Sequence, residues 1–583
     1  AENGISSIEV VKNLYALDTK EDPYFSITCD KEIIRTDGES ARIVITGDNG
    51  YDLGREHQVA INVFRENEEG PPVISLTELA RGTHGGKICL YADIALDTRG
   101  IYDVEVTLAD IGTGQSRVKR SGKLITVTPA LAPRERAIEL VIPTGDEQNA
   151  WYPMIDLSVY PPGTTIILRD DPGLPEGYKR RLFIRNAKGT FESPIIITID
   201  QDTPYHIPFV SYNGINVNHC EHVVFDGRGY RNISKGIHVH PYGEEWGETA
   251  VIAPDGTNET EFFEMELSNT MFAGFVCKTE AQPDRPEYWY GNFEYNRLSI
   301  HHCHIHDTNG EGAYLGYFDA GEITGVNSAG EEVTFRPHSM ENTRIYRNDW
   351  INIGYDAIQL NNARSSEICH NNIENAGWRN EADQASGMSL SLQGRIYNNV
   401  IRNFCGPGIQ VAPFGELEIF NNIISGTQDG SMALLFLFDN HIPEHAVEGD
   451  INTGIPIYVH NNVLVGRKTC VSARNTVQFR SVFIDDNLML YKTGLLGGQT
   501  DETLEVWRSL MRCNETRQYN EVDFADLDTL KIADSANGDF RISYDSPLMR
   551  AGYGLRFKFD FNGYRPWYSD TYPVGPFQGI CVD

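Results

Sequence analysis

Two acidic residues occupy equivalent positions in neighbouring segments of the sequence. Glu311 precedes residues 312–315 and Asp356 precedes residues 357–360, and each of these runs begins with a small residue and continues as a short alternating pattern. If the two runs lie side by side, crowding raises the pKa of one carboxyl group and leaves a protonated acid beside an ionised partner. Glycoside hydrolysis uses such a pair, with carboxyl groups about 5 to 5.5 Å apart for retention and about 6.5 to 9.5 Å apart for inversion.

The residues around this pair have side chains that suit a sugar, because aromatic faces stack on sugar rings while amides and carboxylates bond hydroxyl groups. We expect Glu311 and Asp356 to be catalytic together with Asp307 and with His306, the histidine nearest to the pair. The expected substrate contacts are Tyr314, Tyr317, Asp319, Gln359, Trp350, Trp378 and Asp383. In the alternative interpretation, Glu311 and Asp356 bind backbone amides of turns, or hold a structural Ca²⁺ ion with Asp307 and Asn309.

A second group with chemical potential is the run of histidines that contains His301, His302, His304 and His306. In an extended strand His302, His304 and His306 would share one face, which suits a metal ion or a general base. No Asp, Glu or His partner stands at a recognised ligand spacing, so we interpret these histidines as solvent-facing or hydrogen-bonded and assign no metal to them.

The elements that position these residues belong to a repeat over residues 296–490. An Asn-rich doublet followed by an apolar residue recurs along it, and the second members of the doublets are 23, 27, 23, 40 and 25 residues apart. Periods of this length predict a solenoid in which each repeat is one coil. The doublets are Asn348-Asp349, Asn371-Asn372, Asn398-Asn399, Asn421-Asn422, Asn461-Asn462 and Asp486-Asn487.

A short strand pattern runs in phase with the doublets. Apolar and outward positions alternate after a small residue in the runs 312–315, 357–360, 387–390, 408–411 and 431–434. A period of two residues predicts strands, while the Leu skeleton of leucine-rich repeats and the 3.6-residue period of helical repeats are both missing. We therefore predict an all-β solenoid.

With these two patterns the sequence resembles the right-handed parallel β-helix proteins of the pectate-lyase-like superfamily. The Asn doublets stand where that family stacks Asn side chains between coils, so we assign them a structural role. The resemblance implies a right-handed parallel β-helix and a carbohydrate-active enzyme. The polygalacturonase signatures Asn-Thr-Asp, Asp-Asp and Gly-His-Gly do not occur as a set, because Asp485-Asp486 lacks its companions. The catalytic residues of those hydrolases therefore cannot be transferred to this chain.

Polysaccharide lyases of the same fold provide a competing prediction. They resemble one another in using an Arg or Lys base, usually with Ca²⁺ or another cation that masks the uronate carboxylate. No motif singles out one base among Lys278, Arg344, Arg347, Arg364 and Arg379. A non-catalytic glycan-binding or adhesin-like surface protein is a third alternative, because fold does not dictate function.

Two domains are expected. Residues 1–130 contain short alternating runs between Gly, Asp and Asn turns, and part of this segment is similar to the last strands of bacterial immunoglobulin-like modules, so we predict a small β-sandwich. The β-helix is expected over residues 131–583, with a C-terminal cap near 538–583 that resembles the ending common to secreted β-helix proteins. Loop excursions are expected near 241–292, 319–341 and 438–454.

The composition limits partners and location. The 49 basic and 82 acidic residues give a net charge of −33, which disfavours nucleic acid and acidic membranes. The sequence contains no run of 18 apolar residues, so it predicts no transmembrane segment. The ten cysteines contain no CxxC pair, and we interpret them as core residues. The sequence begins at Ala1 instead of Met, which suggests that a leader was removed, and the sequence leaves open how. The resemblance to secreted β-helix proteins implies a secreted, periplasmic or bacterial cell-surface protein.

Taken together, these patterns favour a glycoside hydrolase over a lyase, acting in a groove beside the coils of residues 296–390. The acidic composition favours a neutral or weakly charged glycan. No cofactor is assigned, and Ca²⁺ is the one metal ion that the alternatives bring into consideration. The glycan, its linkage, the stereochemical outcome and the oligomeric state are left open by the sequence.

Overall fold

The computed structural model describes most of the chain up to residue 437 and shorter segments beyond it. None of the helices in this described part is long and apolar enough to cross a membrane. The described residues are 25–47, 52–66, 70–112, 116–142, 153–173, 180–209, 212–242, 247–317, 321–426, 428, 430–437, 457–474, 482–485, 487–491, 494–497, 511–512, 515–518, 532–534 and 539–542.

The chain divides into two compact units, one formed by residues 1–131 with 522–583 and one by residues 132–521. In the first unit two sheets share one apolar core, to which Ile43 contributes from one sheet and Ile61 from the other. One sheet has the antiparallel order β1 (Phe25–Cys29), β3 (Ser40–Gly47), β7 (Lys87–Ala95) and β6 (Ala80–His84). The other has the order β2 (Ile33–Arg35), β9 (Ser116–Thr128), β8 (Gly100–Asp110), β4 (His57–Arg65) and β5 (Ile74–Leu76). The relation to immunoglobulin-like modules stays a prediction.

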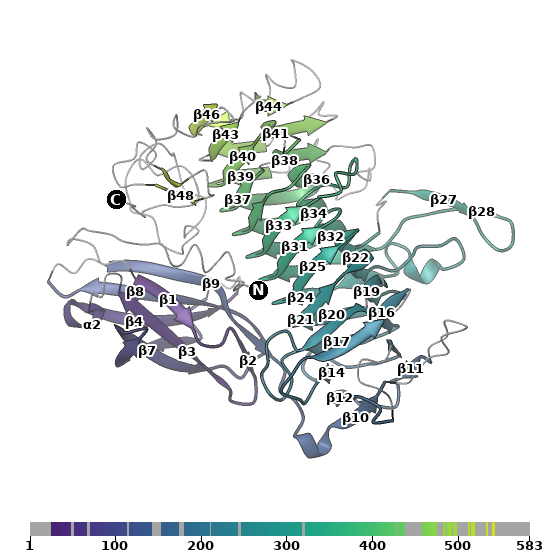
Figure 1. Ribbon diagram of the computed structural model, residues 1–583, viewed down its shortest axis with the longest axis horizontal. Coiled ribbons are helices and arrows are strands. Elements are labelled where there is room, and N and C mark those ends of the chain that lie inside the picture. Colours follow the sequence, from purple (N-terminus) through teal and green to yellow (C-terminus); the bar gives the residue numbers. More distant parts are fainter. Residues whose placement is uncertain are drawn as a thin grey trace. The chain divides into compact units, whose positions relative to one another are not determined.

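The second unit is a parallel β-helix, which confirms the predicted fold class. Its coils are carried by a 24-stranded and an 11-stranded sheet, and Figure 1 shows them stacked in chain order from β12 (Thr165–Arg169) to β44 (Gly494–Gly497). Apolar side chains from both sheets fill one continuous core. Alternation along each strand sends the remaining side chains outward.

Two successive coils carry the candidate residues. The first runs through β24 (Ser299–His301), β25 (His304–Thr308) and β26 (Glu311–Leu315), and the second through β30 (Arg344–Tyr346), β31 (Asp349–Ile353) and β32 (Ile358–Cys369). Their strands pair in parallel, with Ile300 opposite Ile345, Ile305 opposite Trp350 and Ala313 opposite Ile358. The middle strand of each coil, β25 or β31, belongs to the 11-stranded sheet and the outer two to the 24-stranded sheet.

The asparagine doublets form a ladder at one corner of the coils. Each of the first five ladder residues donates its side-chain N–H to the side-chain oxygen of the Asn one coil further on, over 2.9–3.1 Å. The ladder residues are Asn348, Asn371, Asn399, Asn422, Asn462 and Asn487. The residue before each of the first five has a positive φ between 54° and 56°, which is the left-handed conformation that the corner requires. The structural role predicted for the doublets is confirmed, although the second interval, from Asn371 to Asn399, is 28 residues instead of 27.

The predicted excursions have different outcomes. The one near 241–292 is wrong for most of its length, because β19 (Gly247–Ala253) completes one coil of parallel strands, and β20 (Asn258–Phe263), β21 (Met265–Ser268) and β22 (Thr270–Cys277) form the next coil. Within 319–341, β27 (Ile323–Val326) and β28 (Glu332–Phe335) form a separate antiparallel hairpin, which projects from the coils in Figure 1. The segment 438–454 lies outside the described residues. So does the predicted cap near 538–583, except β48 (Asp539–Ile542).

The ladder makes a prediction for stability. In Asn399→Ala, Asn371 loses the oxygen that accepts both its backbone and its side-chain N–H, and the Ile368 carbonyl loses its donor. We expect the free energy of unfolding to fall by about 3 kcal/mol, because buried polar groups are left unpaired. Urea denaturation followed by far-ultraviolet circular dichroism measures the change. Glu374→Ala, at an exposed position of β33 (Asn372–Ala376), is the control and should stay within about 0.5 kcal/mol of the parent. An equal effect of both variants would contradict the role of the ladder.

Candidate functional site

Glu311 and Asp356 lie on adjacent coils. Glu311 is the first residue of β26, and Asp356 stands two residues before β32. The backbone N–H of Gly312 donates to the carbonyl oxygen of Asp356 at 3.0 Å, and that of Ala313 donates to Ala357 at 3.1 Å. The two acidic residues are therefore neighbours across the same edge of the 24-stranded sheet.

Both carboxyl groups are buried, and burial changes their acidity. Glu311 is 3% exposed and Asp356 is 2% exposed. Burial raises the pKa of Glu311 to about 7, against a smaller opposing effect of Lys278. Burial also raises the pKa of Asp356 to about 7, and the charge of Glu311 adds to this rise. Two carboxyl groups that ionise near neutral pH therefore share this edge of the sheet.

The two carboxyl groups differ in their hydrogen bonds. The Asp356 Oδ1 atom accepts the backbone N–H of Ser386 at 2.7 Å, an interaction that favours its ionised form. The Glu311 Oε2 atom is buried and has no hydrogen-bond partner among the described residues. Asp356 is thus held in one orientation, whereas one oxygen of Glu311 is open to a further group.

Gly312 permits the close approach of the two coils. A Cβ atom at this position would lie 2.8 Å from the Cε3 atom of the Trp350 ring, and it would also collide with the carbonyl oxygen of Ala357. The Trp350 ring lies in the core beneath the strand, fully buried, with its indole N–H directed to Asn371 at 3.4 Å. The expectation that Trp350 contacts a substrate is therefore wrong, because its side chain points inward.

A partly exposed aromatic group borders the acidic pair. Tyr314 is half-buried, and burial raises its pKa to about 12, with a contribution from Glu311. Its ring makes an edge contact with the ring of Phe272, with 6.0 Å between the centroids. The Phe272 side chain is 39% exposed. The Lys278 ammonium lies 4.4 Å from the centroid of Tyr314 and 5.6 Å from that of Tyr317. These rings offer an apolar surface next to the two acids.

The remaining predicted substrate contacts are distributed over several elements. Gln359 pairs with Tyr314 across the coils and is 9% exposed. Trp378, 43% exposed, and the exposed Asp383 lie in the connection between β33 and β34 (Met388–Tyr397). Asp319 lies outside the described residues.

His306 and Asp307 are not on the sheet that carries the acidic pair. Both belong to β25 of the 11-stranded sheet, where the Nδ1 atom of His306 lies 2.7 Å from Asp307 and its Nε2 atom 3.6 Å from Glu266. The pKa of Glu266 is lowered to about 2, chiefly by its hydrogen bond with His306. His306 therefore has carboxylate partners of its own. Among the described residues no contact joins it to Glu311, so a direct catalytic role beside Glu311 has no support.

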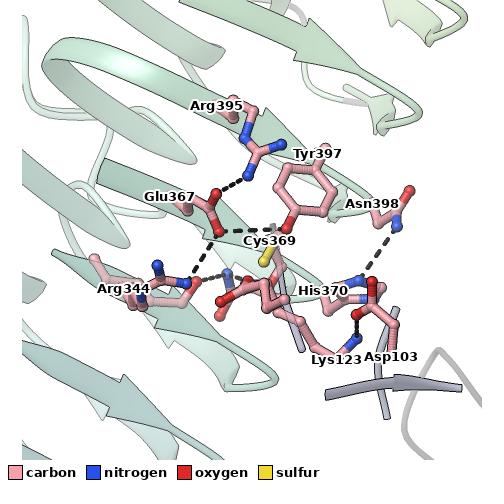
Figure 2. Close-up of polar contacts among 12 residues, drawn as sticks. Asp103, Lys123, Arg344, Glu367, Cys369, His370, Arg395, Tyr397 and Asn398 are labelled. Carbon is pink, nitrogen blue, oxygen red and sulfur yellow. Dashed lines mark hydrogen bonds and ion pairs between the residues drawn. The ribbon is translucent and has the colours of Figure 1, made fainter. Parts of the chain in front are cut away.

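The arginines proposed as alternative bases are engaged in other contacts. Figure 2 shows Arg344 and Arg395 both directed to Glu367. The Arg344 Nη1 atom lies 3.5 Å from the Glu367 carboxylate, and the Tyr397 hydroxyl donates to the same carboxylate at 3.4 Å. Arg364 contacts Glu341 and the Tyr290 hydroxyl, and Arg379 contacts the Asn309 carbonyl. Arg347 occupies the left-handed corner before Asn348. Lys278 is the candidate base that lies at the acidic pair, where it forms an ion pair with Glu280 at 2.6 Å.

Ser386, Ser389 and Phe272 lie at the site but were not among the site residues expected from the sequence. A signal for Ser386 was present, because it stands immediately before residues 387–390, as Glu311 and Asp356 stand before their own runs. Ser389 lies opposite Gln359 in the outward row, and its side chain lowers the pKa of Asp356, against the larger effect of burial. Phe272 gave no signal, because its segment was assigned to a loop.

Comparisons with known proteins concern the fold. Residues 288–477 match a family model described as a right-handed beta helix region. A GH136 lacto-N-biosidase from Eubacterium ramulus has a solved structure that is 12% identical, covers 62% of this chain and has a TM-score of 0.37. The chain spans 63% of the length of that protein.

Two other solved structures are similarly distant. The periplasmic alginate epimerase AlgG is 12% identical with a TM-score of 0.24, covering 60% of this chain and 84% of its own. A GH87 alpha-1,3-glucanase from Streptomyces thermodiastaticus is 11% identical with a TM-score of 0.22, covering 68% of this chain and 85% of its own. No curated protein matches the sequence.

The raised pKa of Glu311 predicts how stability depends on pH. An unfolded carboxyl group ionises near pH 4, so between about pH 4 and pH 7 the folded chain binds more protons than the unfolded chain. The stability associated with protonated Glu311 is present below pH 4 and is lost as the pH rises through 7. We expect Glu311→Gln to gain stability relative to the parent, by on the order of 2 kcal/mol, between pH 4 and pH 8.

Urea unfolding of both proteins at pH 4, 6 and 8 measures this difference. Glu332→Gln, at an exposed position of β28, is the matched control and should follow the parent at every pH. If Glu311→Gln also follows the parent, the carboxyl group of Glu311 has an ordinary pKa and the electrostatic description of the site is wrong.

Proposed function

We propose that this chain is a carbohydrate-active enzyme, and specifically a glycoside hydrolase with Glu311 and Asp356 as its catalytic pair. One observation carries the proposal: two buried carboxyl groups lie on adjacent coils, and the pKa of each is raised to about 7. Glycosidases place two carboxyl groups at the scissile bond, one protonated and one ionised. A pair that ionises near neutral pH can hold one proton under physiological conditions.

The hydrogen bonds support a different role for each member of the pair. Glu311 is the general acid, because its buried Oε2 atom has no partner among the described residues and can hold a proton toward a leaving oxygen. Asp356 is the ionised partner, because the Ser386 N–H stabilises its charge and fixes its orientation. In the first step Glu311 protonates the glycosidic oxygen while the sugar carbon loses its bond to the leaving group.

The strand pairing favours retention of configuration. Paired strands are about 4.8 Å apart, and retaining enzymes have carboxyl groups about 5 to 5.5 Å apart. Asp356 then forms the covalent bond to the sugar carbon, and Glu311, now ionised, removes a proton from the water that releases the sugar. Inversion needs room for a water molecule between the acids, which two directly neighbouring coils provide less readily.

The surroundings favour a neutral or weakly charged glycan. Phe272 and Tyr314 provide rings for stacking on sugar faces. Glu280 and Glu311 both interact with the Lys278 ammonium, and Asp356 lies next to Glu311, so the local charge repels a uronate carboxylate. The net charge of −33 acts in the same direction. We place the enzyme in the periplasm, at the cell surface or outside the cell, where polymeric glycans are encountered.

A lyase is the second candidate, and the position of Lys278 is the observation that favours it. A lysine close to Tyr314 resembles a base beside a proton donor. The ion pair with Glu280 at 2.6 Å argues against this alternative, because it engages the lysine. Incubation with a panel of glycans separates the candidates: new reducing ends indicate a hydrolase, absorbance of an unsaturated uronate indicates a lyase, and retention without products indicates a binding protein.

Substitution of either acid tests the proposal directly. Glu311→Gln and Asp356→Asn preserve shape and remove the proton chemistry, so we expect each to lower kcat for glycan hydrolysis at least about 1,000-fold. The rate of the parent should depend on pH as a bell with its limbs on either side of about pH 7, because both acids ionise there. Reducing-end assays across pH 5 to 9 provide both measurements.

The control for these variants is again Glu332→Gln, which should retain the activity of the parent. Circular dichroism verifies that each variant is folded. Full activity of both Glu311→Gln and Asp356→Asn would place the reaction elsewhere, even if the chain proved to be a hydrolase.

Phe272 provides a test of the binding surface. Its exposed ring touches Tyr314 and has no polar group to take part in proton transfer. We expect Phe272→Ala to raise KM about 5- to 10-fold with kcat within about twofold, because loss of stacking weakens ground-state and transition-state binding alike. Val326→Ala, at an exposed position of the hairpin, is the control. A fall in kcat without a change in KM would contradict a role in stacking.

A further inference from the structure

A row of histidines runs up the outer face of the 11-stranded sheet. Parallel pairing places His206 opposite His238, His238 opposite Glu266, and Glu266 opposite His304 on successive coils. A second row two residues along contains His240, Ser268 and His306. The side chains of this face are polar, whereas the residues between the two rows point into the core.

Three side chains of these rows converge. The Nε2 atom of His306 lies 3.6 Å from Glu266 Oε1, and the rings of His304 and His306 stack with 4.3 Å between their centroids. One ligand atom from each residue lies within 4.8 Å of the other two, and all three side chains are half-buried. We propose that Glu266, His304 and His306 bind a divalent transition-metal ion of the zinc class.

The hydrogen bonds around His306 fit a metal ligand. Its Nδ1 atom lies 2.7 Å from Asp307 Oδ2, and the other Asp307 oxygen accepts the Asn352 side-chain N–H at 3.0 Å. In the neutral imidazole Asp307 holds the proton of His306 on Nδ1, so a metal ion can take the place of the proton through which Nε2 otherwise interacts with Glu266. This carboxylate–histidine arrangement is the one that orients imidazole ligands in metal sites. Asp307 is therefore a positioning residue.

The donor set selects the class of metal. Two imidazole nitrogens and one carboxylate oxygen suit Zn²⁺, Co²⁺, Ni²⁺ or Cu²⁺, whereas Ca²⁺ and Mg²⁺ prefer oxygen ligands. The second oxygen of Glu266 lies 3.6 Å from His238 Nε2, so Glu266 can present its first oxygen to a metal while the second stays oriented. Ligand bonds of about 2.0 to 2.2 Å require the three side chains to close by small rotations.

Calorimetric titration of the full chain, freed of metal with a chelator, with Zn²⁺ tests the site. We expect one ion per chain, and at least about 100-fold weaker binding in His304→Ala, His306→Ala and Glu266→Gln. Asp307→Asn should weaken binding about 10- to 100-fold while the three ligands remain, because the proton of His306 is no longer held on Nδ1. His206→Ala, at an exposed position on the same face, is the control and should bind within about twofold of the parent.

Co²⁺ provides a readout that needs no activity. When bound at this site it should give visible absorption bands that disappear in His304→Ala and in the shape-preserving Glu266→Gln, and circular dichroism verifies that the variants are folded. Absence of stoichiometric binding by the parent overturns the proposal, and so does unchanged binding in Glu266→Gln and His306→Ala, which would place the ion elsewhere. Because binding is measured without a glycan, the result is independent of the proposed hydrolase.

Discussion

The coils are held in one register by asparagine amides that hydrogen-bond from each coil to the next. The amide of Asn422 donates to Asn462 and to the Ile396 carbonyl, and its oxygen accepts from Asn399, so every polar atom of this buried side chain is paired. A slip of one residue would break all of these bonds at once and would turn outward side chains toward the core. The register is therefore specified by polar groups that have no other partner available.

This register brings distant parts of the sequence together on the faces of the β-helix. A single coil, residues 299–315, supplies Glu311 to the 24-stranded sheet and His304 and His306 to the 11-stranded sheet. The coil after it provides Asp356 for the first group, and the coil before it provides Glu266 for the second. Both candidate sites consist of residues from adjacent coils, because parallel strands place equivalent positions side by side.

The fold class and the neighbourhood of Glu311 and Asp356 were predictable because both rest on periodic signals. The coil of residues 258–277 was not, because its corner is formed by Glu264 with a φ of 52° instead of an asparagine doublet. His302 takes the same left-handed conformation at the next corner, with a φ of 52°, so it cannot share a strand face with His304. Glu266 was not expected as a site residue, because the coil that contains it was not predicted. A partner contributed from another coil has no fixed spacing in sequence when the intervening loops vary in length.

The isolated oxygen of Glu311 bears on whether the acidic pair is only structural. A buried acceptor without a partner costs about 1 to 3 kcal/mol, and a glutamine or an apolar residue at this position would avoid the electrostatic part of that cost. On the same β-helix the buried amides of the asparagine ladder and the buried Glu367 carboxylate are paired. An acid that is buried beside a second acid, with one oxygen unbound and a half-buried tyrosine adjacent, is therefore better explained by chemistry performed on a ligand than by its contribution to the fold.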